Sequence, residues 1–579
     1  MNCKKSLVLL LVVVFVISSF FVGCSNEQSQ PTGQENQENS QGQDSNQENE
    51  SQGSTEPKID KDQVINLYTS EPKSLDTAKS TDVDSAMILT EITENLTRIE
   101  QDENGNDVIK PAAAKNWDIN DDGTVWTFHL RDFNWEDGKP VTAHDFEYGI
   151  KRVLDPKTAS QYAYLLAPIK GALEYNAGEA TAEEVGIKAL NDKTLEFTLK
   201  APCAYFAQLT YFKTMLPQRK DIIEKYGDTY GTEADKIIGC GPFKMDKWVH
   251  NNEISIVKSD TYWDKDSVKL QRVNYKVINE PNARYNALYN GTIDSCGVSK
   301  TEWIEKFEKS GKFKRLQGYD PSTNYQFYNQ KDELFKNANI RKAFSLSITR
   351  EDMAEVIFHG LYKAAYGWVP PSLQIDGKDY RDLAQVEPLR KLKKENPDPK
   401  ELLIKGLKEL GLDPDPSKHT VTMLMTGTTQ WDRNYAEYCQ QMLKKNLGIN
   451  MKAKYVEWPI FQKLTEEMDY QIGGMAWIGD YNDPMTFLDM WLSNARMVPT
   501  GWVNEEYDSI IAEAQSILDP KKRLECFMKA EHILLYEDAV IAPTVYRQRN
   551  TFRAKYVKNL MSPLFGTSEV KYAYIQGKN

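Results

Sequence analysis

The side chains that most often carry out catalysis are not arranged for it in this sequence. No HExxH, GxSxG or GxxxxGK[ST] pattern occurs, and none of the six histidines pair at helical spacing. They are His129, His144, His250, His359, His419 and His532. The five cysteines beyond residue 24 form no CxxC, which disfavours a zinc site or a dense disulfide scaffold. They are Cys203, Cys240, Cys296, Cys439 and Cys526, and their sequence positions do not pair them. We therefore expect no enzymatic activity, no metal and no cofactor.

One segment partly matches a calcium-binding loop. Asp118, Asn120, Asp122 and Gly123 follow the first half of an EF-hand pattern, but the twelfth position is His129 where the bidentate Glu should stand. The residues after Gly123 alternate between apolar and polar, as in a strand. We interpret residues 120–123 as a hairpin turn.

Cys24 is a candidate for covalent modification. Lys4 and Lys5 precede an apolar run over residues 7–22, which is typical of an export signal. Phe21-Val22-Gly23-Cys24 resembles a bacterial lipobox, although Leu is usual at the position of Phe21. The pattern predicts a signal peptide over residues 1–23 and a lipid (palmitate) on Cys24, with a transmembrane anchor as the alternative.

Residues 24–57 are expected to tether a folded part to the membrane. Beyond Cys24 this segment has no aliphatic or aromatic side chain and consists mainly of Ser, Asn, Gln, Glu and Gly. Such a composition cannot offset chain entropy by burial, so we expect disorder and a span on the order of 30 Å. The net charge of −13 also argues against a nucleic-acid partner.

A long run between residues 111 and 153 predicts a strand, a turn, a second strand and a helix. It reads Pro-Ala-Ala-Ala-Lys-Asn-Trp from Pro111, Trp-Thr-Phe-His-Leu-Arg from Trp126, and Trp-Glu-Asp-Gly-Lys-Pro-Val-Thr-Ala-His-Asp-Phe from Trp135. Thr142 is a good helix N-cap, with Asp145 at capping-box spacing. Phe146, Ile150 and Val153 would then share one helical face.

This run resembles the signature of the family 5 solute-binding proteins, the oligopeptide- and dipeptide-binding group. Further matching pieces follow the family's order: Ser74-Leu75-Asp76 after a strand at 65–68, Gly239-Cys240-Gly241-Pro242-Phe243, Tyr262-Trp263, Phe335-x-Asn337, Arg341-x-Ala343, Arg350 and Trp502-x-Asn504. The resemblance covers residues 60–560.

The resemblance implies an α/β, bilobal, periplasmic-binding-protein-like fold of type II, in the class with an extra third domain. Lobe I would comprise residues 58–93, 231–320 and 549–579. The extra domain would comprise residues 94–230, and lobe II residues 321–548. The ligand would lie enclosed between two hinged lobes.

The resemblance also implies ligand-binding residues. In Ala476-Trp477-Ile478-Gly479-Asp480-Tyr481-Asn482, Asp480 corresponds to the carboxylate that pairs with a peptide α-ammonium. A buried ammonium needs such a partner, because an unpaired buried charge is costly. Main chain near Ile478 and Val83 would pair with the peptide backbone. Trp458, Trp477, Tyr481 and Tyr162 are the aromatic candidates, for which core packing is the alternative.

The sequence departs from the family at the peptide's carboxyl end. Arginines that meet the carboxylate in the family correspond to Thr465 and Gly474 here, and only Lys463 is cationic between Trp458 and Trp477. Peptide length and carboxyl-end recognition are therefore left open.

The expected protein is an extracytoplasmic, monomeric lipoprotein on the outer face of the cell membrane. Its partners would be short peptides and the permease and ATPase subunits of an ABC importer. Three alternatives stay open: another ligand on the same fold, such as a nickel chelate or sugar; a peptide pheromone receptor; and a secreted hydrolase, which a nucleophile beside a base would indicate.

Overall fold

The computed structural model describes residues 59–102, 105–427, 429–495 and 498–578, which belong to one compact unit. The predicted signal peptide, Cys24 and tether lie outside the described residues. None of the helices in the described chain combines the length and the apolar composition of a membrane-spanning segment.

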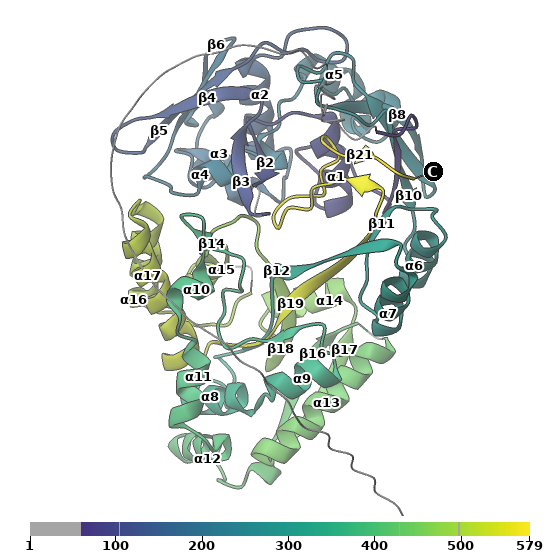
Figure 1. The fold of residues 1–579 in the computed structure, drawn as a ribbon. Helices are drawn as coiled ribbons and strands as arrows, with labels where there is room; N and C mark the ends of the chain where they lie inside the picture. Colours follow the sequence, from purple (N-terminus) through teal and green to yellow (C-terminus); the bar gives the residue numbers. More distant parts are fainter. Residues whose placement is uncertain (1–58, 103–104, 428, 496–497, 579) are drawn as a thin grey trace, which may run out of the picture. The chain divides into compact units, whose positions relative to one another are not determined.

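The first sheet joins segments that are far apart in the sequence. Its order is β1-β10-β9-β8, with β1 parallel to β10. Its strands are β1 (Val64–Thr69), β8 (Phe243–Val249), β9 (Glu253–Lys258) and β10 (Arg272–Val277). Around it lie α1 (Val83–Ile92), α6 (Pro281–Tyr289), α7 (Thr301–Ser310), and the short strands β20 (Val557–Lys558) and β21 (Tyr574–Ile575) (Figure 1). β1 confirms the strand predicted at 65–68.

The signature run contributes the first two strands of a second, antiparallel sheet of order β4-β5-β7-β6. Its strands are β4 (Ala114–Ile119), β5 (Val125–Leu130), β6 (Ile187–Asn191) and β7 (Thr194–Thr198). The same region holds the hairpin β2 (Thr97–Gln101) and β3 (Asp107–Pro111), and the helices α2 (Ala143–Leu154), α3 (Ala172–Asn176), α4 (Phe206–Leu209) and α5 (Lys220–Tyr226).

Local sequence explains these elements. β4 and β5 are joined by the predicted turn, where Gly123 has φ +73° and Asn120 Oδ1 accepts the Val125 amide at 2.8 Å. The predicted capping box starts α2, with the Asp145 carboxylate accepting the Thr142 amide at 2.8 Å. The predicted apolar face of α2 is fully buried. The calcium-loop alternative gains no support, because no cluster of metal-ligating side chains occurs among the described residues.

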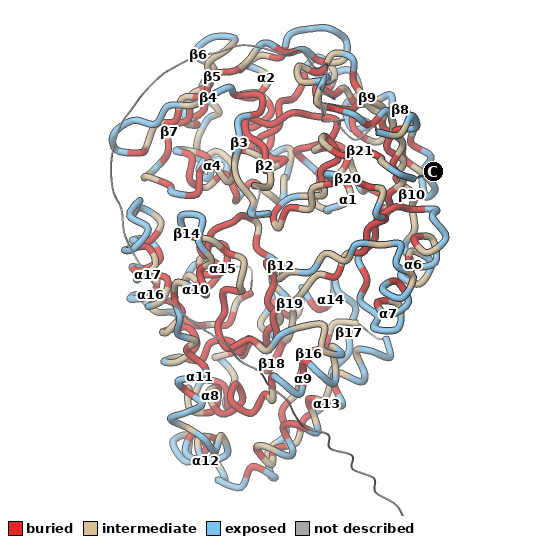
Figure 2. Tube along the Cα trace, in the orientation of Figure 1, coloured by how far each residue is buried: buried red, intermediate tan, exposed pale blue. Residues whose placement is uncertain are grey.

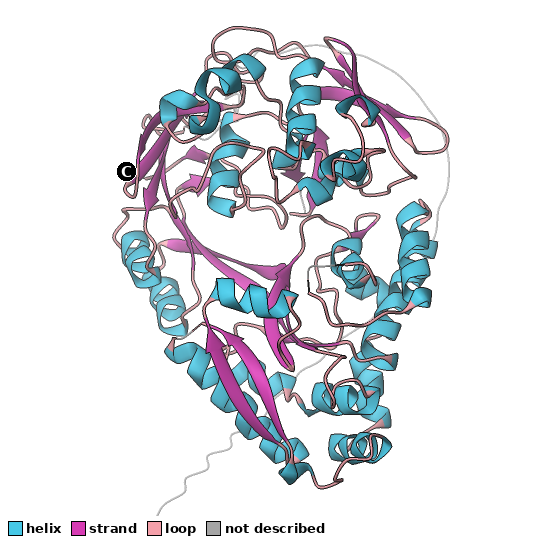
Figure 3. Ribbon diagram, turned by 180° about the vertical axis from the view of Figure 1, so that it is seen from behind, coloured by secondary structure: helices cyan, strands magenta, loops and turns pink. Residues whose placement is uncertain are grey.

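The third sheet is the largest and contains two long strands. Its order is β11-β19-β12-β18-β16-β17, with β13 beside β19. The strands are β11 (Ser295–Gly297), β12 (Phe313–Tyr328), β13 (Lys363–Ala364), β16 (Thr420–Thr426), β17 (Asn450–Val456), β18 (Ile472–Ile478) and β19 (Ile541–Ala554). Seen from behind, helices flank its strands (Figure 3).

The helices of this region follow one another along the chain. They are α8 (Ala338–Ser347), α9 (Arg350–Val356), α10 (Tyr380–Ala384), α11 (Pro388–Glu395), α12 (Pro399–Glu409), α13 (Gln430–Leu447), α14 (Trp458–Glu466), α15 (Met485–Leu488), α16 (Glu505–Ser516) and α17 (Pro520–His532). A two-residue hairpin, β14 (Gln374–Ile375) and β15 (Lys378–Asp379), lies before α10.

β12 changes environment along its length. Residues 313–320 of β12 are mostly partly buried or exposed, whereas 321–328 are mostly buried (Figure 2). The β12–β19 register shifts between the Tyr319 and Thr323 pairs. These changes fall beside the predicted boundary between lobes at 320/321, and the domain boundaries themselves stay a prediction.

The glycines of the Gly-x-Gly-Pro-Phe motif are required by close packing. The Ile92 carbonyl accepts the Cys240 and Gly241 amides at 3.0 Å each. A Cβ on Gly239 would lie 2.2 Å from that oxygen, so only glycine fits. The Glu136 carboxylate of the signature accepts the Gly239 amide at 2.7 Å. The motif thus fastens the end of α1 to the signature region.

Candidate functional site

The backbone around Asp480 is held by neighbouring strands and a hydroxyl. β18 pairs with β12 as far as Ile478 opposite Ser322, and the next amide, Gly479, donates to Pro321 at 2.8 Å. The Asp480 amide donates to Thr486 Oγ1 at 3.0 Å. The position of the carboxylate is therefore set by the large sheet and not by a free loop.

The Asp480 carboxylate itself has one hydrogen-bond partner among the described residues. The Tyr164 hydroxyl donates to its Oδ2 at 3.0 Å, and no backbone amide of the described residues donates to it. It is therefore not a turn or capping aspartate. Burial raises the pKa of Asp480 to about 6, while the Tyr164 hydrogen bond and the charge of Lys213 act to lower it. At neutral pH the carboxylate is ionised and has no cation within ion-pair distance in the described chain.

A second carboxylate lies deeper in the same region. Burial and the nearby charge of Asp480 raise the pKa of Asp489 to about 7. The Tyr481 hydroxyl donates to Asp489 Oδ2 at 3.3 Å, and the Tyr481 ring stacks on Tyr205 at 4.6 Å. Tyr481 is thus buried against Tyr205 and Asp489.

The other aromatic candidates differ in exposure. Trp477 is partly buried, and its indole donates to the Thr486 carbonyl at 2.8 Å. Trp458, the first residue of α14, is 47% exposed and stacks on Phe461. Tyr162 is partly buried and its ring lies 6.0 Å from that of Tyr164. Trp458 therefore has the most free surface for a ligand.

The two predicted backbone positions have different local structures. Ile478 is 49% exposed at the end of β18. One edge of β18 pairs with β12 over its whole length. Its other edge pairs with β16 only at residues 472 and 473, so over residues 474–478 this second edge has no strand beside it within the described sheet. That edge can accept an extended chain. Val83 is 71% exposed but is the first residue of α1, capped by Asp82, and lies in no strand.

The sequence did not single out Tyr164, Tyr211 or Lys213. Tyr164 contacts Asp480. Burial lowers the pKa of Lys213 to about 8, while the charges of Asp82 and Asp480 act to raise it. Burial raises the pKa of Tyr211, and the charges of Asp107 and Asp480 add to that shift. Tyr164 follows Tyr162 by two residues, and Lys213 directly follows Tyr211 and Phe212. No sequence pattern marked Lys213 as part of the site.

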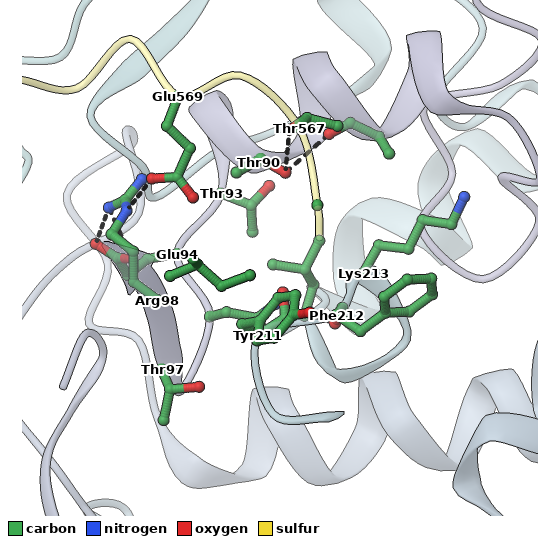
Figure 4. A pocket seen from close by; sticks show the side chains of 15 residues that line it. Thr90, Thr93, Glu94, Thr97, Arg98, Tyr211, Phe212, Lys213, Thr567 and Glu569 are labelled. Atoms are coloured by element: carbon green, nitrogen blue, oxygen red, sulfur yellow. Dashed lines mark hydrogen bonds and ion pairs between the residues drawn. The ribbon is translucent and has the colours of Figure 1, made fainter. Parts of the chain in front are cut away.

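A small cavity of about 60 Å³ lies beside these residues (Figure 4). Its walls come from α1, β2, residues 211–216 and the C-terminal segment 566–569. At one side Arg98 bonds Glu94 at 3.2 Å and Glu569 at 2.8 Å. The Tyr211 hydroxyl and Asn95 Oδ1 are buried without a hydrogen-bond partner in the described chain. Polar groups of this kind suit one or two water molecules.

The cysteines take no part in this site. Cys203, Cys240, Cys296, Cys439 and Cys526 are free in the structure. Burial raises the pKa of the Cys203 thiol to about 12, so it is protonated and unreactive at neutral pH.

The chain is similar to known proteins over most of its length. Residues 108–498 match the model of the bacterial extracellular solute-binding proteins, family 5 Middle. The oligopeptide-binding protein OppA of Bacillus subtilis is 34% identical, covering 88% of this chain and 91% of that protein. The dipeptide-binding protein DppE of the same species is 32% identical, covering 87% and 90%.

A solved structure agrees with this result. Listeria monocytogenes OppA bound to peptide has a TM-score of 0.73 and 31% identity, covering 90% of this chain and 100% of that chain. The expected α/β, bilobal periplasmic-binding fold is thereby confirmed. This chain belongs to the bacterial extracellular solute-binding proteins of family 5.

Proposed function

We propose that this protein binds short peptides between its two lobes and delivers them to the permease of an ABC importer. The observation that carries the proposal is the ionised Asp480 carboxylate, which is fixed by the sheet, partly desolvated and partnered by a single phenol. A peptide ammonium would supply the missing cation. The two relatives from Bacillus subtilis, named as an oligopeptide-binding and a dipeptide-binding protein, support the same ligand class.

The β18 edge supports recognition of the peptide backbone. Residues 474–478 present amide and carbonyl groups beside Asp480. Hydrogen bonds to a peptide main chain bind it without reading its side chains. Trp458, Trp477 and Tyr162 would line the space for the peptide's side chains, and Val83 would contact the peptide from lobe I.

The same proposal includes a lipid anchor on Cys24 and a monomeric protein on the outer face of the membrane. Its support is the sequence alone: the apolar run, the lipobox-like Phe21-Val22-Gly23-Cys24 and the polar segment that follows. In this role the protein would return its peptide uncleaved.

The direct test is to identify the molecules that the protein carries. The purified protein is denatured, and the released material is analysed by mass spectrometry. A mixture of short peptides is expected. Release of a sugar or a metal chelate, with no peptide detected in repeated preparations, would contradict the proposal.

A further inference from the structure

The described part of the chain buries two lysines, and their surroundings differ. Lys571 forms an ion pair with Asp264 at 2.9 Å. Lys213, only 8% exposed, lies within 4.0 Å of no carboxylate oxygen of the described residues. A buried ammonium without a counter-ion is costly, so the lack of a partner at Lys213 needs an explanation.

The hydrogen bonds of Lys213 do not compensate for this. Its Nζ donates to Ser80 Oγ at 3.3 Å and to the Asp82 carbonyl at 3.5 Å. Both distances exceed the roughly 2.7–2.9 Å of a good charge-assisted bond. The Asp82 carboxylate caps α1 by accepting the Ser85 amide at 2.7 Å and the Ser85 hydroxyl at 2.8 Å, and it forms no ion pair with Lys213.

Lys213 lies next to the proposed ammonium site. Its Nζ is 4.8 Å from the centre of the Tyr162 ring, the Tyr162 ring packs on Tyr164, and Tyr164 bonds Asp480. Figure 4 shows the Lys213 ammonium extending away from Arg98 and Glu569, so it does not join their ion-pair cluster. One anion and one cation, each without an ion-pair partner, therefore face the same region.

Lys463, the only cation between Trp458 and Trp477, does not fill this role. Lys463 has a side chain that is 67% exposed and pairs with Glu467 at 3.9 Å on the surface of α14. Gly474 has no side chain, and Thr465 is buried with its hydroxyl unpartnered in the described chain. Lys213 is the buried cation that remains beside Asp480.

We propose that Lys213 binds a carboxylate of the peptide and makes this protein selective for peptides that carry a carboxylate close to their ammonium end. The carboxylate has two possible sources: an acidic side chain at the first or second position, or the α-carboxylate of a very short peptide. This inference rests on the proposed peptide-binding function. It adds a charge preference that Asp480 alone does not create.

The test is calorimetric titration of the full-length protein with two series of peptides. In the first, tetra-alanine is compared with tetrapeptides that carry Glu or Lys at position one or two. In the second, trialanine is compared with its C-terminal amide. Wild type is expected to prefer the carboxylate-bearing member of at least one series by about tenfold or more. The series that shows the preference identifies the source of the carboxylate.

Variants assign the preference to Lys213. Lys213→Met and the polar Lys213→Gln should reduce it to within about threefold, while Lys463→Met, the surface control, should leave it unchanged. Two results with wild type together would overturn the inference without any variant. They are equal affinity for the Glu and Lys peptides, and an affinity for trialanine no higher than that for its amide. A preference that survives both Lys213 variants would also overturn it. Failure of every peptide of both series to bind wild type would instead refute the peptide-binding proposal, and this inference with it.

Discussion

The hydroxyl of Tyr164 lies 3.0 Å from Oδ2 of Asp480, although 316 positions separate the two residues in the chain. Tyr164 belongs to the short 3₁₀ helix Ala163–Leu166 of the predicted extra domain, and Asp480 follows β18 of the large sheet. A carboxylate can accept about four hydrogen bonds, so this phenol leaves room for a ligand ammonium. The bond joins two parts of the protein at the atom proposed to hold the peptide.

Replacing Asp480 should weaken binding of peptides with a free ammonium. Asp480→Ala removes the proposed counter-ion, and truncating one partner of a buried charge pair costs about 2–5 kcal/mol, or roughly 30- to 4,000-fold in affinity. Titration of a free-amine tetrapeptide against both proteins measures the loss. N-acetylated peptides lack the ammonium and serve as the control, so the substitution should change their affinity much less. A loss below about threefold for the free-amine peptide would show that Asp480 is not the counter-ion.

Peptide affinity should fall in mild acid. The pKa of Asp480 is raised to about 6 in the unliganded protein, and a bound ammonium would lower it. Affinity should therefore be highest near pH 7 and fall by about a decade per pH unit below pH 6, giving roughly 30-fold between pH 7 and 4.5. Above about pH 7.7 the α-ammonium of the peptide itself loses its proton, so the titration is confined to the acid side. Titration across this range measures the profile. Asp489, whose pKa is raised to about 7, also changes charge here. The acetylated peptide controls for that change, because it would report Asp489 but not the ammonium contact.

Tyr164→Phe should move this pH profile upward. The Tyr164 hydroxyl stabilises the ionised carboxylate, so its loss should raise the pKa of Asp480 further. The midpoint of the affinity loss should then lie at a higher pH than in wild type. Tyr175→Phe, on a tyrosine of α3 that is not part of the site, is a matched control and should leave the midpoint in place. An unchanged midpoint in Tyr164→Phe would show that the Tyr164 hydroxyl does not influence the pKa of the group that controls affinity.

Glu91→Gln should stabilise the protein in mild alkali. Glu91 is buried, accepts the Val570 amide at 2.7 Å, and has its pKa raised to about 8 by burial and by the charge of Glu569. A raised pKa in the folded state gives stability that is present below the ordinary pKa of about 4.3 and is lost as the pH rises to about 8. The neutral amide avoids that loss. Its melting temperature relative to wild type should therefore be higher at pH 8 than at pH 5.

Removing the cation of the same cluster should have the opposite effect. Arg98→Met leaves Glu94 and Glu569 without their shared partner. Breaking a buried pair in this way costs about 3–5 kcal/mol, so this variant should have a lower melting temperature than wild type, most of all at pH 8.

The outcome that would contradict the Glu91 prediction is equally clear. If the melting temperatures of Glu91→Gln and wild type differed by the same amount at pH 5 and pH 8, Glu91 would not be the titrating group.

Cys24→Ala should release the protein from the membrane. The lipid proposed for Cys24 is the anchor, so the variant should appear in the medium or stay unprocessed. Cell fractionation and immunoblotting against wild type measure this. A variant that is processed and retained in the membrane fraction like wild type would show that Cys24 carries no anchor.

Local chemistry made much of this fold predictable. The turn at 120–123, the Thr142–Asp145 capping box and the buried face of α2 depend on residues a few positions apart, and short-range geometry is encoded in short-range sequence. Asp480 was predicted as the ammonium partner because its neighbours match a family motif. Those features could be predicted without any knowledge of how distant segments pack.

Tertiary packing decided the rest. Tyr164 and Lys213 meet the surroundings of Asp480 only because the chain brings residues 162–164, 211–213 and 480 together. The Arg98–Glu569 pair spans 471 positions. Whether a charge is desolvated, and which group neutralises it, depends on contacts between segments that no local pattern records. For that reason the sequence alone identified the family and the proposed ammonium partner, and only the three-dimensional structure revealed the unpaired buried cation beside it.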